Sequence, residues 1–283
     1  MHIDADQFRA WIGRSEARQD LVTAAPLAML SATLDRDDPA PAAGGPVPPL
    51  WHWLYFTPLA RQSEIGPDGH PRRGGFLPPV ALPRRMWAGG RLDFHDPLRV
   101  GDEATRVSRI ASVDVKQGRS GTLVFVTVHH DISTGRGLAI HEEHDIVYRD
   151  HPQPGQSGPA AQPARTDETF SRQLEPDPVL LFRYSALTFN GHRIHYDRPY
   201  VTQVEGYPGL IVHGPLIATL LLDLLRRNAP GRAVRRFGFR AVRPVFDIHP
   251  FTVCGRIEAD GRADLWTRDH EGFLTMEAGA ELA

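Results

Sequence analysis

The sequence has almost no cysteine and almost no lysine. Cys254 is the only cysteine, which excludes an intramolecular disulfide and any zinc site built from several thiolates. Lys116 is the only lysine, so arginine carries nearly all of the positive charge. Arginine binds carboxylates and phosphates through paired hydrogen bonds, but a biased genome composition would produce the same excess. The arginine content is therefore compatible with an anionic ligand without indicating one.

An excess of charge of one sign is also lacking, as is a long uninterrupted apolar run. The formal net charge is −2, too small to indicate nucleic acid or an anionic membrane as a partner. The longest apolar run, 209–225, is broken by His213, Gly214, Pro215 and Asp223, so it predicts a buried helix rather than a membrane span. The first residues lack the basic and then apolar pattern of a signal peptide. We expect a cytoplasmic protein.

The composition is that of a globular protein, with 41% hydrophobic and 23% charged residues in a chain of 283. This length suits one large domain or two of ordinary size. Segments 35–49 and 151–166 are rich in proline and glycine and are typical of surface connections. We predict an N-terminal module at 1–150, a linker at 151–172 and a C-terminal module at 173–283.

The two halves resemble each other in sequence. Residues 30–32 (Leu-Ser-Ala) and 184–186 (Tyr-Ser-Ala) each end an amphipathic run, at an offset of 154. Pro97 and Pro244, at an offset of 147, each precede an isoleucine by thirteen residues. The similar offsets predict a duplicated module with a small deletion.

Alternating apolar residues predict strands in both halves, after a helical beginning in each. The expected strands are 119–130 and 138–148 in the first half, and 236–245, 251–259 and 272–282 in the second. A helix followed by several antiparallel strands, twice, predicts an α+β double hotdog, in which each curved sheet wraps around a helix.

The central helix is well marked only in the second half. Pro215 suits a first helical turn, and Leu216, Leu220 and Leu224 form one apolar stripe. In the first half, the segment 51–58 (Trp-His-Trp-Leu-Tyr-Phe-Thr-Pro) stands where this helix would begin. We therefore expect the N-terminal module to keep the fold with a degenerate helix and no active site.

Polar residues gather just before the central helix, where backbone N–H groups are free to bind developing negative charge. His195 could carry protons near neutral pH. Gly214 offers an N–H to a carbonyl oxygen that gains negative charge, and its missing side chain allows a substrate to approach the backbone closely. Asn190 can orient a water molecule but cannot act as a general base. This combination indicates an enzyme that acts beside a carbonyl group.

The pattern Asn-Gly-His-Arg-Ile-His-Tyr-Asp at 190–197, followed by Ile-Val-His-Gly-Pro at 211–215, resembles the motif of the MaoC-type, (R)-specific enoyl-thioester hydratases. Further segments resemble the branch of mesaconyl-C4-CoA hydratases and mitochondrial hydroxyacyl-thioester dehydratases; they are 51–56, 73–79, 83–90, 185–197 and 240–244. The resemblance implies reversible hydration of an enoyl-CoA without a metal or redox cofactor, with mesaconyl-C4-CoA to citramalyl-CoA as the leading example. Asn190 departs from the family, which has Asp at this position.

We expect Asn190, His195 and Gly214 to be catalytic, with His195 transferring protons and Asn190 positioning the water. Asp197 could supply a carboxylate instead, although a structural role suits it better. Candidate substrate contacts are His192, Arg193, His213, Arg240 and Arg243. The arginines could bind CoA phosphates or a substrate carboxylate.

Other functions stay open at this point. They are a 3-hydroxyacyl-thioester dehydratase of fatty-acid or polyketide synthesis, a hotdog thioesterase, and a silent acyl-CoA-binding module or heteromer subunit. A monomer and a homodimer of double hotdogs are both compatible with the sequence. The segment 141–144 (His-Glu-Glu-His) is not expected to bind metal, because positions i and i+3 of a strand face opposite ways.

Overall fold

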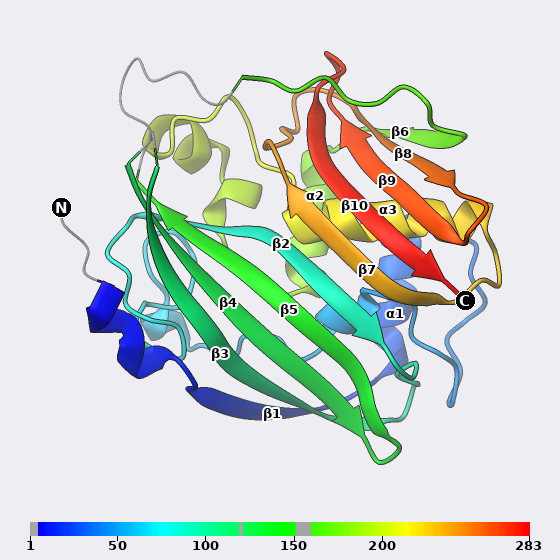
Figure 1. Ribbon diagram of the computed structural model, residues 1–283, viewed down its shortest axis with the longest axis horizontal. Coiled ribbons are helices and arrows are strands. Elements are labelled where there is room, and N and C mark those ends of the chain that lie inside the picture. Colours follow the sequence, from blue (N-terminus) through cyan, green and yellow to red (C-terminus); the bar gives the residue numbers. More distant parts are fainter. Residues whose placement is uncertain (1–4, 119–120, 151–159) are drawn as a thin grey trace.

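The computed structural model describes residues 5–118, 121–150 and 160–283, and its main feature is one antiparallel sheet of ten strands. Figure 1 shows the sheet as a continuous curved surface with the helices behind it. The strand order is β1-β3-β4-β5-β2-β7-β10-β9-β8-β6. The strands are β1 (Ser15–Leu21), β2 (Arg84–Phe94), β3 (Glu103–Gly118), β4 (Gly121–Thr134), β5 (Gly137–Arg149), β6 (Phe170–Leu174), β7 (Val234–Ala241), β8 (Phe251–Ile257), β9 (Arg262–Arg268) and β10 (Leu274–Leu282).

The order of the strands is symmetric about the β2–β7 pair. Each half runs strand, helix and then four strands, with α1 (Ala24–Thr33) in the first and α2 (Pro178–Leu187) with α3 (Gly214–Asn228) in the second. At the junction a Cβ on Gly89 would lie 2.5 Å from the carbonyl oxygen of Phe239, so only glycine lets the two half-sheets pair there. The prediction of an α+β double hotdog is confirmed.

Several element boundaries differ from the expectation. Each half begins with a strand before its helix, and β9 lies between two strands that the sequence indicated. The edge strand β1 is Ser-Glu-Ala-Arg-Gln-Asp-Leu and buries no residue fully, so it lacks the apolar alternation that marks a half-buried strand. Of the predicted linker 151–172, residues 151–159 lie outside the described part, and β6 already begins at Phe170.

The second half wraps around α3, which packs against β6, β8, β9 and β10. Leu216, Leu220 and Leu224 are buried as their spacing predicts. Asp223 is also buried on this helix, and its carboxylate is paired with Arg36 at 2.6 Å and Arg227 at 2.7 Å. Because Arg36 follows α1, this buried acid fixes the central helix to the first half of the chain.

No long helix fills the first half. Between α1 and β2, all of which is described, the helical elements are the short 3₁₀ turns η2 (Trp51–Leu54) and η3 (Gln62–Glu64). Val80 and Leu82 from this segment pack on Val124, Val126 and Tyr148 of the sheet. In the part of the chain that the structure describes, no helix is long and apolar enough to cross a membrane.

Candidate active site at the start of the central helix

His195 is buried in the short 3₁₀ turn η4 (Arg193–His195), just before the chain reaches α3. Its Nδ1 lies 2.6 Å from the carbonyl oxygen of Ile211, so Nδ1 carries the proton and donates it. Nε2 is thereby left as an acceptor. Burial lowers the pKa of His195 to about 4, against the opposing effect of the Ile211 carbonyl. The ring is therefore neutral near pH 7 and ready to take a proton at Nε2.

His213 holds the His195 ring in place. The two rings stack with centroids 3.7 Å apart, and His213 Nε2 lies 2.8 Å from the Ser185 hydroxyl of α2. His213 is fully buried, and this burial lowers its pKa well below the usual value. It stands at the N-cap position of α3. The structure thus places His213, a predicted substrate contact, in a packing position against the other imidazole.

The first turn of α3 offers a free backbone donor. The first intrahelical hydrogen bond runs from the Ile217 N–H to the His213 carbonyl, at 3.1 Å, so the Gly214 N–H has no partner within the helix. Pro215 has no N–H at all. A Cβ on Gly214 would meet no atom within 4 Å, which shows open space beside this residue. Gly214 therefore presents a donor to a free volume at the positive end of the helix.

Asn190 lies in the turn between α2 and η4. Its Oδ1 accepts the His192 backbone N–H at 3.0 Å, and its own N–H donates to the Ser185 carbonyl at 2.8 Å. The turn therefore occupies the amide oxygen. The Nδ2–H group is the part of the side chain that remains for a water molecule.

A loop of the first half, residues 66–73, covers this turn and is called the covering loop below. The Arg193 N–H donates to the Asp68 carbonyl at 2.9 Å. Gly69 has φ +88, and a Cβ on it would lie 1.8 Å from the Gly191 carbonyl oxygen, so two glycine backbones meet directly. This contact brings side chains of the N-terminal half to the motif of the C-terminal half.

Arg193 and Asp197 hold the covering loop against the turn that contains Asn190. The Arg193 guanidinium pairs with Asp197 at 2.8 Å, donates to the Pro67 carbonyl at 2.9 Å and lies 4.1 Å from the centre of the Tyr200 ring. With its donors engaged in this way, Arg193 fixes the covering loop. Asp197 has the structural role that suited it from the sequence.

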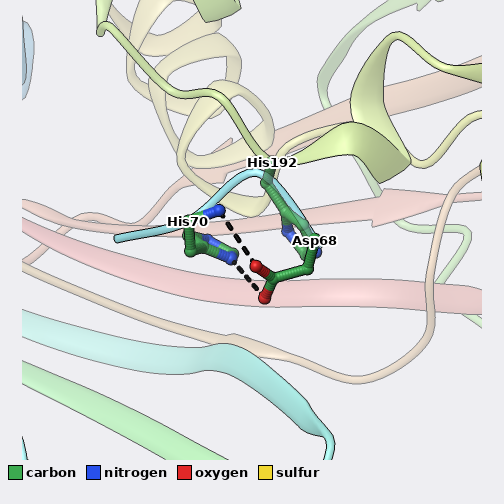
Figure 2. A group of neighbouring side chains, drawn as sticks. All are labelled: Asp68, His70 and His192. Atoms are coloured by element: carbon green, nitrogen blue, oxygen red, sulfur yellow. Dashed lines mark hydrogen bonds and ion pairs between the residues drawn. The ribbon is translucent and has the colours of Figure 1, made fainter. Parts of the chain in front are cut away.

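Asp68 and His70 join His192 in a group that the sequence did not indicate (Figure 2). The Asp68 carboxylate accepts the His70 backbone N–H at 3.0 Å and lies 3.2 Å from His70 Nδ1. The His70 and His192 ring centroids are 4.0 Å apart, and the ring of His192 meets that of His195 edge-on at 5.4 Å. A line of imidazoles thus leads from the start of α3 to the covering loop. No spacing rule connects residues so distant in sequence, so only the fold could reveal them.

The ligand atoms of Asp68, His70 and His192 lie within 4.8 Å of one another, a spacing that a metal ion could span. The positive charge around the group opposes the binding of a metal ion. The group opens on a cavity of about 490 Å³ whose walls carry four arginines and only two carboxylates. Burial and the nearby charge of Arg85 lower the pKa of His70 and of His192. The cavity therefore suits an anion better than a cation.

Arg240 and Arg243 are not brought to this site. Phe237 and Phe239 of β7 point inward, so Arg240 points outward, where it pairs with Glu277 at 2.7 Å. Arg243 lies 3.4 Å from Asp269 in the β9–β10 turn. Both arginines have carboxylate partners in the protein, and their role as substrate contacts stays a prediction.

The first half contains a buried polar cluster of its own. Glu142 lies 3.1 Å from His52 Nε2 and 3.1 Å from Trp53 Nε1. Burial opposes ionisation of Glu142, but the bond to His52 prevails and its pKa falls to about 2. His141 points the other way, to Asp131 at 2.6 Å, while the ring of His144 stacks on Trp87. His141 and His144 therefore occupy opposite faces, as expected for a strand.

The counterpart of Gly214 in the first half cannot donate a hydrogen bond. The Val47 N–H donates to Leu98 just as the Val212 N–H donates to Val245, at 2.7 and 2.9 Å. This match aligns 48–49, Pro-Pro, with 213–214, His-Gly. Because proline has no N–H, the first half offers no equivalent donor.

Buried neutral imidazoles predict an acid-labile fold. Burial lowers the pKa of His195 and His130 to about 4 and that of His144 to about 3. In the unfolded chain they titrate near 6.5. Below that value the unfolded chain binds protons that the folded chain does not, so acidification favours unfolding by about 1.4 kcal/mol per group and pH unit. Urea titrations should show the unfolding free energy falling from about pH 6.5 to about pH 4, less steeply in His195→Gln. A flat profile would contradict this.

Comparison with known proteins shows the family to which the chain belongs. The family model of hydroxyacyl-thioester dehydratase type 2 matches residues 50–247, the segment that contains the covering loop, η4 and α3. The chain belongs to the hydroxyacyl-thioester dehydratase type 2 family. Members of this family are hydro-lyases, and the site described above is consistent with one.

The relatives extend over nearly the whole chain. Mesaconyl-C(4)-CoA hydratase of Chloroflexus aurantiacus is 49% identical over 97% of this chain and 98% of its own. The mitochondrial hydroxyacyl-thioester dehydratase type 2 of Schizosaccharomyces pombe is 27% identical over 83% and 88% of the two chains. Together they confirm the resemblance to the branch that the sequence motifs indicated.

Solved structures confirm the fold. HtdX of Mycobacterium tuberculosis matches with a TM-score of 0.64 at 20% identity, over 95% of this chain and all of that one. A second Mycobacterium tuberculosis protein, described as having a double hotdog fold, matches with a TM-score of 0.58 at 14% identity over 96% of each chain.

Proposed function

We propose that this member of the family adds water reversibly to the α,β double bond of an enoyl-CoA, with mesaconyl-C4-CoA to citramalyl-CoA as the leading reaction. The observation that carries the reaction type is the neutral, buried His195, whose free Nε2 lies close to a helix start with an unpaired N–H. The similarity to Mesaconyl-C(4)-CoA hydratase of Chloroflexus aurantiacus supports the substrate.

The residues divide the reaction between them. The Asn190 Nδ2–H group binds the oxygen of the attacking water, while His195 Nε2 takes a proton from it. The hydroxide bonds to Cβ as the double bond shifts electrons onto the thioester oxygen. The Gly214 N–H stabilises the resulting enolate. His195 then returns its proton to Cα, which leaves the enzyme unchanged and one water added.

A low pKa suits His195 for the second step, in which it acts as an acid. Because burial disfavours the imidazolium, protonated His195 is a strong acid that readily gives its proton to the enolate carbon. The hydrogen bond to the Ile211 carbonyl keeps the Nδ1 tautomer throughout. One imidazole can thus act as base and then as acid without a carboxylate at position 190.

The reverse reaction, dehydration of a 3-hydroxyacyl thioester, uses the same groups. The family and its Schizosaccharomyces pombe member carry this activity in their names, which favours it as the second candidate. A cytoplasmic location, and a monomer or homodimer of double hotdogs, remain predictions from the sequence.

The proposal is tested with purified protein and mesaconyl-C4-CoA, crotonyl-CoA and a 3-hydroxyacyl-CoA. Enoyl absorbance and free CoA are followed in parallel. We expect enoyl absorbance to fall, or to rise from the hydroxyacyl substrate, with no release of CoA. Release of CoA would instead show a thioesterase, and binding without turnover would show a silent module.

Replacement of Asn190 tests its role in holding water. We expect Asn190→Ala to lower kcat by about 10- to 100-fold with little change in KM, because an unpositioned water attacks less often. Asn190→Asp loses the Nδ2–H donor but keeps the hydrogen bond to the His192 N–H and can hold the water as an acceptor, so it should retain more activity than the alanine variant. Steady-state kinetics of both variants decide this. Equal rates in Asn190→Ala and the parent protein would remove Asn190 from the mechanism.

A further inference from the structure

The cavity beside the motif carries an unbalanced positive charge. It is lined by His192 and Ile194 of the motif, by residues of the covering loop and β2, and by four residues of the segment 200–207. Its arginines are Arg72, Arg73, Arg84 and Arg85, and its carboxylates are Asp68 and Glu205. Because the imidazoles of His70 and His192 are held neutral, they add no positive charge, and the excess comes from the arginines. A volume of about 490 Å³ lies in the range of small-molecule sites.

Most of these arginines are already engaged or exposed. Arg84 pairs with Glu205 at 3.2 Å and lies over the ring of Tyr207. Arg73 donates to the carbonyls of Val80 and Pro83, each at 2.5 Å. Arg72 is exposed at the rim. These three therefore have structural roles or lie in solvent.

Arg85 differs from its neighbours. It is half-buried on β2, directly opposite Tyr148 in the β2–β5 ladder, and its charge opposes the rise that burial causes in the pKa of Tyr148. In the described part of the chain Arg85 forms no ion pair with a carboxylate. The charge of Arg85 helps to lower the pKa of Asp68 without an ion pair between them, and both oxygens of Asp68 accept hydrogen bonds from His70, as Figure 2 shows. A guanidinium in this position retains donors for an external anion.

We infer that Arg85 binds a free carboxylate at the far end of the acyl group and so makes the site selective for dicarboxylic monothioesters. This inference rests on the proposed function. The cavity adjoins the catalytic imidazoles at His192, so an acyl chain whose thioester lies at Gly214 can extend past His195 toward Arg85. The selective residue would then come from the N-terminal half and the catalytic residues from the C-terminal half. This division gives the first half a function although it lacks the motif.

An anion at Arg85 could also be a phosphate of CoA. The two sources are separated by non-reactive thioesters that share the CoA moiety. Succinyl-CoA carries a distal carboxylate, whereas butyryl-CoA has the same chain length without it. A phosphate contact affects both ligands equally, and a carboxylate contact affects only the first.

The test measures the dissociation constants of succinyl-CoA and butyryl-CoA by isothermal titration calorimetry. We expect the parent protein to bind succinyl-CoA more tightly. Arg85→Gln should raise the dissociation constant of succinyl-CoA by roughly 10- to 100-fold, as expected for loss of one charge-assisted contact. The dissociation constant of butyryl-CoA should change by less than about threefold. Arg85→Lys keeps the charge but not the paired donors, so its dissociation constant for succinyl-CoA should lie between those of the parent protein and Arg85→Gln.

Arg91→Gln is the matched control, because Arg91 lies on the opposite, exposed face of the same strand with Glu143 and Asp145. It should change neither constant. Equal weakening of both ligands in Arg85→Gln would assign the contact to phosphate, and no change in either would remove Arg85 from the site. Thermal melting verifies that each variant is folded. Since binding is measured without turnover, a failure of hydration is seen separately.

Discussion

His195→Gln should lower kcat for hydration by about 10³-fold, the largest effect of any single side chain. His195 supplies the acceptor for the water proton and the donor for Cα, and no neighbour can replace it in both steps. His213 is turned to Ser185, and His192 lies edge-on, beside His70. The rate is measured from the loss of enoyl absorbance with mesaconyl-C4-CoA.

Glutamine is chosen because it is neutral, close to histidine in size and unable to carry a proton, and loss of the Nδ1 bond to the Ile211 carbonyl should cost about 1 kcal/mol of stability. Butyryl-CoA should bind to the variant as it does to the parent. His141→Gln, which removes an imidazole from the outer face of β5, should keep full activity. If His195→Gln folds, binds and retains more than about a tenth of the parent rate, the assignment of His195 is wrong.

Gly214→Pro should lower kcat by about 10²- to 10³-fold through loss of a single backbone donor. Proline is compatible with the first turn of a helix. His213 before it has φ −59 and ψ 129, a conformation that a following proline allows. The first half already carries Pro49 at the aligned position. The variant should therefore fold and bind thioester while it fails to stabilise the enolate.

Gly214→Ala is the matched control for the donor. It keeps the N–H, and the added Cβ meets no atom within 4 Å, so the helix should be at least as stable. Its effect should fall on KM, because the methyl group enters the space that the thioester would occupy. An alanine variant with the same loss of kcat as the proline variant would show that space, not the N–H, is what Gly214 provides.

The sequence predicts the second half of the molecule well, for physical reasons. The leucine stripe of α3 and the proline in its first turn define that helix without tertiary information. His195 and Gly214 follow from the chemistry that imidazole and a helix start perform. The failure of the first half to form a long helix also follows from the segment at 51–58.

Features that depend on contacts between distant segments could not be predicted. Asp68 and His70 reach the site through a loop whose placement rests on the meeting of Gly69 and Gly191. Arg240 has a favourable position in sequence, yet the alternation of β7 turns it outward. The polar edge strands β1 and β6 lack an apolar pattern because they lie at the sheet edges, where sequence alone resembles a loop.

The account claims that water is added to a carbon–carbon double bond while the thioester stays intact, and isotope labelling tests this most directly. Mesaconyl-C4-CoA is incubated with the protein in ¹⁸O-labelled heavy water, and the products are analysed by mass spectrometry. We predict an intact CoA thioester with one ¹⁸O at Cβ and one deuterium at Cα, and no such product from His195→Gln. Appearance of ¹⁸O in the carboxyl group of a released acid, with free CoA, would contradict the account.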